Sequence, residues 1–251
     1  MRTATEGFFV KLADIFRFAT LVIREGLTPP YERKEFIRQC FEIGWKSLAL
    51  TSVSGFIVGF VFVTQTRTSL DVFGGTSAMP TLLAIAVVRS LAPLVTALVV
   101  CGRVGSQIGA EVNAMRITEQ IDAMEVSATN PHKFLLSTRV WATTIMVPVL
   151  CFYAMLISFF GGFLSTATVS DLSFLAFLIQ VFDSLHFIDL VGMVTRAIVF
   201  GFTIGMTSCY VGYHHHFGVQ GVGKAANWAV VYSIFLIFLE ELLILRFFSI
   251  F

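Results

Sequence analysis

Five long apolar segments, separated by shorter polar ones, dominate the pattern of hydrophobic and polar residues along this chain. A helix needs about 20 apolar residues to cross a bilayer, and these segments are of about that length. They lack the alternation of polar and apolar residues that a membrane β-barrel requires. The pattern therefore predicts an all-α, polytopic membrane protein, with spans at residues 47–65, 80–102, 140–165, 188–212 and 228–248.

The region before the first span is predicted to lie on the membrane surface. Residues 6–27 are apolar but are interrupted by several charged residues, which is typical of an interfacial amphipathic helix. Pro29 and Pro30 end this helix. Residues 32–46 form a second one, with apolar residues on one face and most basic residues off it. No cleavable signal peptide is expected. The predicted domains are residues 1–46 and residues 47–251.

The distribution of basic residues between the loops predicts the orientation in the membrane. Loops 103–139 and 213–227 carry lysine or arginine, whereas loop 166–187 has neither. The positive-inside rule therefore places the N-terminus and the two basic loops in the cytoplasm, and five spans then place the C-terminus outside. Within the third loop, the apolar segment 172–182 is too short to span and is predicted to lie at the outer interface.

The segment between the second and third predicted spans is longer than a reversal of the chain requires. A connection of about five residues would be enough. Instead, residues 116–127 form a polar, helix-forming segment of about a dozen residues. We interpret it as an exposed helix on which a cytoplasmic partner docks. Its polar residues are Arg116, Thr118, Glu119, Gln120, Asp122 and Glu125.

Composition agrees with a membrane protein and excludes several other classes. Charged residues make up 13% of the chain, about half their share in soluble domains. The net charge of +1 gives no indication of nucleic-acid binding. The sequence shows no serine–histidine–aspartate grouping and no zinc-protease motif, so no catalytic residue is predicted. The isolated cysteines are interpreted as small buried residues. They are Cys40, Cys101, Cys151 and Cys209.

Two motifs resemble ligand-binding sites, but we do not interpret either of them as one. Residues 218–225 fit a P-loop up to the last position, where Ala225 replaces the serine or threonine that holds magnesium. We interpret this segment as a flexible cytoplasmic turn, so ATP hydrolysis would belong to another chain. His214, His215 and His216 are adjacent, and adjacent helical residues point in different directions. A polar cluster at the membrane surface is therefore favoured over a metal site.

Four charged residues fall well inside the predicted spans, away from the ends. A charge within the membrane costs several kcal/mol unless it is paired or faces a wet cavity. At about 1.5 Å per residue, the four lie near one level, just outside the bilayer midplane. Two roles are compatible with this pattern: a salt-bridge network within the helix bundle, or a polar cavity for a charged lipid headgroup. The four residues are Arg89, Arg196, Glu240 and Glu241.

Residues 89–106 together with residues 118–125 closely resemble the MlaE permease family. Members of this family are the membrane subunits of ABC transporters of lipids that work with MCE proteins. The resemblance covers roughly residues 36–250. It extends to residues 41–48, 55–65, 196–201 and 221–225.

The resemblance implies a homodimer in the bacterial inner membrane, bound to two cytoplasmic ABC ATPases and to an MCE protein ring on the periplasmic side. The substrate would be a phospholipid moved between inner and outer membranes, which bears on the lipid asymmetry of the outer membrane. Helix 116–127 would be the coupling helix. ATP and magnesium would bind to the ATPase, with no cofactor on this chain. The resemblance also allows a small regulatory subunit bound to the ATPase.

By position, the resemblance implies a lipid cavity lined by the first and second spans near the dimer axis. In this sequence Ser90 stands where the family usually has glutamate next to the arginine. Losing that carboxylate would leave Arg89 less neutralised, and we expect a shift of headgroup preference towards anionic lipids. The candidate cavity residues are Phe60, Thr64, Gln65, Leu70, Arg89 and Ser90.

Three other classes of membrane protein compete with this interpretation. A secondary transporter of lipids or small molecules would be expected to show inverted repeats and paired broken helices, which the sequence lacks. An enzyme of lipid metabolism would need a convergent set of acid, base or metal-binding residues, and none is evident. A membrane scaffold without ATPase coupling would account for helix 116–127, but it gives no reason for charges inside the spans.

Overall fold

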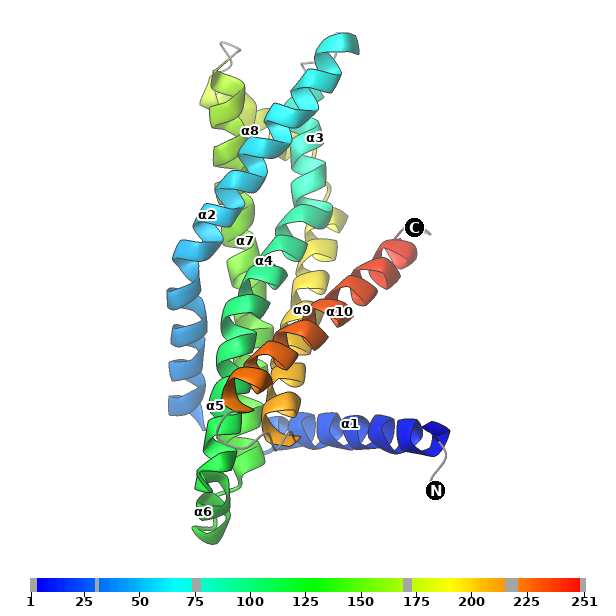
Figure 1. Ribbon diagram of the computed structural model, residues 1–251. Helices are drawn as coiled ribbons and strands as arrows, with labels where there is room; N and C mark the ends of the chain where they lie inside the picture. The colour runs from blue at the N-terminus through cyan, green and yellow to red at the C-terminus, as the bar shows by residue number, and fades with distance from the viewer. Residues whose placement is uncertain (1–3, 30–31, 74–77, 169–172, 215–220, 249–251) are drawn as a thin grey trace. The chain divides into compact units, whose positions relative to one another are not determined.

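The computed structural model describes residues 4–29, 32–73, 78–168, 173–214 and 221–248. These residues are almost entirely helical and include no β-strand, which confirms the predicted all-α fold (Figure 1). Three of the helical segments are short π-helical stretches, named η. In chain order the helices are α1 (Ala4–Leu27), α2 (Arg33–Phe73), α3 (Met79–Ala86), η2 (Val87–Leu91), α4 (Ala92–Val100), η3 (Cys101–Gly105), α5 (Ser106–Ile117), α6 (Gln120–Val126), η4 (His132–Ser137), α7 (Thr138–Ala167), α8 (Phe174–Asp183), α9 (Phe187–His214) and α10 (Gly221–Phe248).

The described residues contain five helical stretches that are long and apolar enough to cross a membrane. Four of them include a predicted span whole, and Gly221–Phe247 covers all but the last residue of the fifth, so the polytopic architecture is confirmed. The short apolar segment at 172–182 corresponds to the separate ten-residue helix α8. The five stretches are Arg33–Leu70, Met79–Ile117, His132–Ala167, Phe187–His214 and Gly221–Phe247.

Several predicted boundaries differ from the observed ones. Helix α2 continues without a break through position 46, so the predicted helix 32–46 and the first span are parts of one helix. No proline interrupts this stretch, and nothing else there prevents a helix from continuing. Helix α10 begins at Gly221, within the segment interpreted as a flexible turn. Residues 218–220 of that segment lie outside the described residues.

The chain divides into two compact units, each assembled from separate stretches. Unit 1 comprises Met1–Ile43, Cys101–Thr144 and Phe202–Leu236, and unit 2 comprises Gly44–Val100, Ile145–Gly201 and Ile237–Phe251. Every long helix after α1 contributes residues to both. Whether residues 1–46 act as an interfacial domain in a membrane stays a prediction.

In unit 2, small residues let α2 approach α7 closely. The Ser158 hydroxyl donates to the carbonyl of Gly55 at 2.8 Å. A Cβ added at Gly59 would lie 1.8 Å from the Ser158 carbonyl oxygen. The pair of glycines four residues apart therefore allows close packing.

In unit 1, α1 is held against η4 by its apolar face. Figure 1 shows α1 lying across the end of α9. Phe18 and Val22 are buried, and Gly26 lies against the Trp141 ring with no room for a larger side chain. The helix predicted over residues 6–27 is thus confirmed as a helix, and it is packed against the rest of unit 1.

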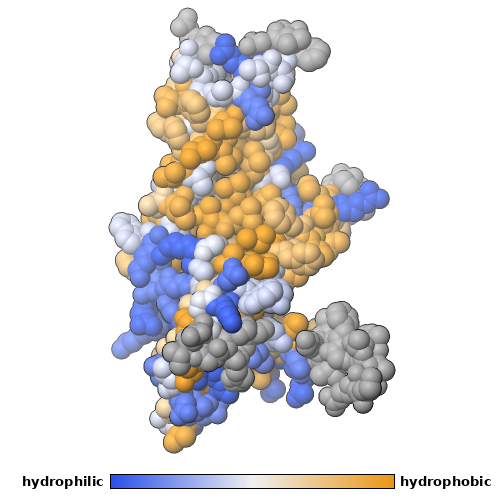
Figure 2. Space-filling view, in the orientation of Figure 1, coloured by the Kyte–Doolittle hydropathy of each residue, from blue (hydrophilic) through white to orange (hydrophobic). Residues whose placement is uncertain are grey.

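Apolar side chains gather on much of the surface shown in Figure 2, over the long helices. On α2 the exposed large apolar residues recur every three to five positions, which forms a stripe along one side of the helix. Such a stripe faces lipid or another protein chain. The exposed residues of the stripe are Ile37, Phe41, Trp45, Leu50, Val53, Ile57 and Val61.

Candidate functional site

A cluster of charged and polar side chains in unit 2 includes Arg89, which lies in η2. Its Nε donates to Oδ1 of Asp189 at 2.7 Å. The Asp189 side chain is 5% exposed, whereas that of Arg89 is 55% exposed. The backbone N–H of His186 donates to the other carboxylate oxygen of Asp189 at 3.2 Å. Asp189 is therefore fixed from two sides and orients an arginine whose outer part is accessible.

A second ion pair in unit 2, Arg196 with Glu241, joins α9 to α10, and Ser90, the neighbour of Arg89 in the chain, contacts it. The Ser90 hydroxyl donates to Oε1 of Glu241 at 3.1 Å. The other carboxylate oxygen of Glu241 lies 3.7 Å from Nε of Arg196. Both charged side chains of this pair are buried. Removing one member of such a pair leaves a buried charge, which typically costs about 3–5 kcal/mol.

The local backbone presents the polar residues of the cluster together. Arg89 and Ser90 lie in the π-helical turn of η2, while Val87 and Val88 of the same turn are fully buried. Turns of this kind occur frequently at functional sites. The widened turn therefore separates two buried apolar residues from two polar residues that contact α9 and α10.

The structure brings together most of the predicted intramembrane charges and adds one that the sequence analysis missed. Arg196 and Glu241 form an ion pair, and Ser90 connects Glu241 to the turn that carries Arg89. Glu240 precedes Glu241 in α10 and is half-buried. Asp189 was missed because it lies in the first turn of α9, where an acidic residue is ordinary.

Arg89 has a carboxylate partner although position 90 is serine, because Asp189 supplies one. A second carboxylate, that of Glu241, lies against Ser90. The two ion pairs, Arg89 with Asp189 and Arg196 with Glu241, are each formally neutral. The expected shift towards anionic headgroups stays a prediction.

The predicted cavity residues of α2 make other contacts within unit 2. The Thr64 hydroxyl lies 2.9 Å from that of Ser165 in α7, and the Phe60 ring stacks on Phe56 with 6.0 Å between centroids. Gln65 is exposed and Leu70 is half-buried. These contacts lead to α7, whereas Arg89 and Ser90 contact α9 and α10. That both groups line one cavity stays a prediction.

The predicted helix 116–127 differs from the observed structure, because the chain breaks within it. Helix α5 ends at Ile117, where the backbone N–H and the hydroxyl of Thr118 both donate to the carbonyl of Ala114. Glu119 then adopts a left-handed conformation with φ of 57°. The exposed element that remains is the seven-residue helix α6.

Helix α6 is anchored to unit 1 and presents an acidic surface. Ile121 is fully buried, while Asp122 bonds Arg116 at 2.7 Å. The Arg116 guanidinium lies over the Tyr213 ring, 5.3 Å from its centroid, which connects α6 to the end of α9. Val126 is 90% exposed. Of the predicted coupling residues, those on the exposed surface are Thr118, Glu119, Gln120, Asp122 and Glu125.

The histidine cluster falls partly outside the described residues, which end at His214 and resume at Gly221. His214 lies near the Tyr210 ring at the end of α9, with 4.4 Å between centroids. Among the residues that the structure describes, no group of three histidine, cysteine or acidic side chains is placed to hold a metal ion.

Comparison with known proteins extends over nearly the whole chain. Residues 36–247 match the family model of the permease MlaE. A probable ABC transporter permease protein of Rickettsia prowazekii is 36% identical over 241 residues, 96% of this chain and 93% of that protein. A probable ABC transporter permease protein of Synechocystis is 30% identical and covers 93% of this chain and 89% of its own length.

A further similar protein comes from a plant. It is the chloroplastic protein TRIGALACTOSYLDIACYLGLYCEROL 1 of Arabidopsis thaliana, 32% identical over 216 residues. The match covers 84% of this chain and 61% of the plant protein. The family match begins and ends within a few residues of the range over which the sequence resemblance was seen.

Proposed function

Because this chain belongs to the MlaE permease family and is an ABC transporter permease subunit, we propose that it moves phospholipids between the inner and outer membranes. It acts as a homodimer with two cytoplasmic ATPase chains and an MCE protein on the periplasmic side. The observation that carries the proposal is the accessible Arg89 guanidinium, oriented by buried Asp189 in a helical segment apolar enough to cross a membrane.

The geometry at Arg89 suits recognition of a phosphodiester. Only Nε of Arg89 is bonded to Asp189, and within the described part of the chain its terminal nitrogens have no hydrogen-bond partner. A guanidinium presents donors in a fixed fork that matches phosphate oxygens. A lipid phosphate can therefore bind to the outer edge of Arg89 without displacing Asp189.

The class of substrate has independent support. The name of the Arabidopsis relative refers to a galactolipid, which favours a lipid over a small polar solute. The two ion pairs of the cluster are each formally neutral, so they leave no large surplus of charge for a lipid headgroup to balance. A neutral, hydrogen-bonding cluster among apolar helices is suited to a headgroup with attached acyl chains.

Helix α6 is the element through which the ATPase acts on this chain. Its acidic exposed face and the apolar Val126 provide a surface that can enter a groove of a partner. The bond from Arg116 to Asp122 and the contact of Arg116 with Tyr213 join this surface to α5 and α9. Movement of the ATPase is thereby transmitted to the helices as a rigid-body motion. ATP and magnesium bind to the ATPase, and the N-terminus faces the cytoplasm.

The test is affinity purification of the chain from native membranes in mild detergent, with mass spectrometry of the proteins and lipids that accompany it. We expect an ATPase, an MCE protein and phospholipid. The Arg89→Ala variant should keep the ATPase but retain about tenfold less phospholipid, since it loses charged hydrogen bonds to phosphate. Arg33→Ala, a change at an exposed arginine outside the cluster, is the control.

Two outcomes would contradict the proposal. Recovery of the chain alone, folded and without an ATPase, would favour the secondary transporter or the scaffold. Unchanged phospholipid in Arg89→Ala would show that the charged cluster of unit 2 serves only to hold the helices together.

A further inference from the structure

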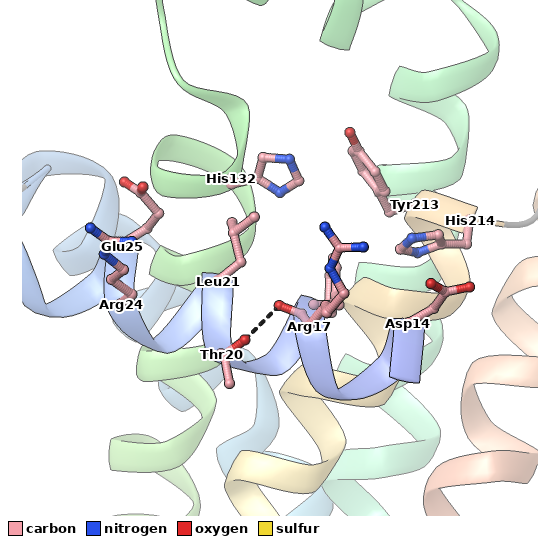
Figure 3. Close-up of a pocket in the computed structure, with 10 residues that line it drawn as sticks. Asp14, Arg17, Thr20, Leu21, Arg24, Glu25, His132, Tyr213 and His214 are labelled. Carbon is pink, nitrogen blue, oxygen red and sulfur yellow. Dashed lines mark hydrogen bonds between the residues drawn. The ribbon is translucent and has the colours of Figure 1, made fainter. Parts of the chain in front are cut away.

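A second candidate site lies in unit 1, in a cavity of about 710 Å³ between α1, the start of η4 and the end of α9 (Figure 3). Cavities of this size commonly bind small molecules. Its charged lining comes from one helix, because Asp14, Arg17, Arg24 and Glu25 all belong to α1. This cavity is separate in sequence from the charged cluster of unit 2, which includes no residue of α1.

The four charged side chains of the cavity form no ion pairs with one another. Within the described residues, none of the four takes part in an ion pair or in a hydrogen bond made by its side chain. Arg17 and Arg24 are seven positions apart, so they lie on the same side of α1. Figure 3 shows the Arg17 guanidinium directed towards the space between His132 and Tyr213. Two cationic and two anionic groups therefore face one cavity and are available to a ligand.

The opposite wall, from η4 and α9, is aromatic. His132 lies 5.2 Å from the Tyr213 ring, and Phe18 of α1 packs edge-on against His214 at 5.2 Å between centroids. An ammonium group is attracted to aromatic faces of this kind.

We propose that this cavity binds the headgroup of a phospholipid that carries both a phosphodiester and a primary ammonium. Arg17 and Arg24 donate to the phosphate. The carboxylate of Asp14, which lies beside His214 in Figure 3, accepts from the ammonium. The equal number of cationic and anionic side chains suits a zwitterion better than a purely anionic group.

The surface of α1 favours a membrane lipid over a soluble phosphoester with the same headgroup chemistry. Leu21 lines the cavity and is 39% exposed. An apolar side chain beside a polar cavity provides a surface for acyl chains, as in interfacial helices. The site itself does not depend on the proposed transport function.

The experiment uses the whole complex in lipid nanodiscs that contain a phosphatidylethanolamine with a photoreactive diazirine close to its headgroup. After irradiation, mass spectrometry locates the labelled peptides. We expect label on residues 14–25 and at the end of α9. The double variant Arg17→Gln, Arg24→Gln should reduce this label about tenfold. Arg33→Gln, which removes an exposed arginine outside the cavity, should leave it unchanged.

Two further arms identify the ligand with the wild-type protein alone. Unlabelled phosphatidylethanolamine should compete for the label, and phosphatidylglycerol should compete less well. Soluble glycerophosphoethanolamine should not compete at the same concentration. Equal competition by the soluble compound would overturn the lipid assignment in favour of a soluble phosphoester. Equal competition by phosphatidylglycerol would overturn the role of the carboxylates.

The outcome is separable from that of the proposed transport function. Arg89→Ala should retain full labelling at α1, because Arg89 is not part of the cavity. Labelling confined to other helices in the wild-type complex would contradict the proposal, whatever the transport measurements show. Thermal unfolding and the elution volume of each variant establish that the complex is intact.

Discussion

At the scale of single residues, the charged cluster of unit 2 shows how a missing carboxylate is supplied from elsewhere in the chain. Position 90 is a serine, yet its hydroxyl bonds the Glu241 carboxylate, and its neighbour Arg89 bonds Asp189. The two acidic residues come from α10 and α9, about 150 and 100 positions away. The charge balance of the site is therefore a property of three helices and not of one sequence motif.

This arrangement predicts that Ser90→Glu is harmful alone and better tolerated with Glu241→Gln. The new carboxylate would lie beside Glu241, and two like charges in such a site repel. Glu241→Gln alone removes the carboxylate charge that lies 3.7 Å from the buried Arg196. The double variant has a single carboxylate at positions 90 and 241. We therefore expect the two changes together to cost about 1 kcal/mol less stability than the sum of their separate costs. Thermal unfolding of the four purified complexes measures it. Additive effects would show that positions 90 and 241 do not interact.

The end of α6 predicts a stabilising change. Ala128 has φ of 57°, and the bonds from Ala128 to Glu125 and from Thr129 to Met124 form a Schellman motif. Glycine is favoured at this position because it has no Cβ to strain the left-handed backbone. Ala128→Gly should therefore stabilise the segment by about 0.5–1 kcal/mol. Hydrogen exchange of residues 120–129 should slow, whereas Ala123→Gly within α6 should accelerate it.

At the scale of elements, the contact of α2 with α7 depends on the absence of side chains. A methyl group at Gly59 would collide with the backbone of Ser158, which cannot yield as a flexible side chain does. Gly59→Ala should therefore destabilise the complex by about 1–3 kcal/mol through overpacking. Gly223→Ala is the matched control, because no atom lies within 4 Å of an added Cβ there. Equal melting temperatures for the two variants would contradict the close helix contact.

How far the sequence predicts these elements depends on the range of the interactions that define them. The spans follow from composition over about 20 residues, so they could be found from the sequence. The break at Thr118 and Glu119 could not, because both residues are compatible with a helix and the turn is set by local hydrogen bonds. Asp189 and the cavity beneath α1 depend on side chains from distant helices, which no local pattern brings together.

At the scale of the whole molecule, the predicted orientation can be tested through the cysteines. Cys101, Cys151 and Cys209 are buried, so a membrane-impermeant maleimide should leave them unmodified once Cys40 is replaced by serine. In that background, Leu175→Cys in the exposed part of α8 should react from the periplasmic side. Val126→Cys in α6 should react only after the inner membrane is opened. The reverse pattern would invert the orientation and remove α6 from reach of a cytoplasmic ATPase.

The central claim is that an ATPase acting through α6 moves a phospholipid held at the charged cluster of unit 2. The most direct measurement is ATP-dependent transfer of fluorescent phospholipid by the complex reconstituted in vesicles. We expect wild type and Arg33→Ala to transfer lipid only with ATP, and Arg89→Ala to transfer about tenfold less while keeping its ATPase bound. Transfer that needs no ATP, or that is unchanged in Arg89→Ala, would contradict the account.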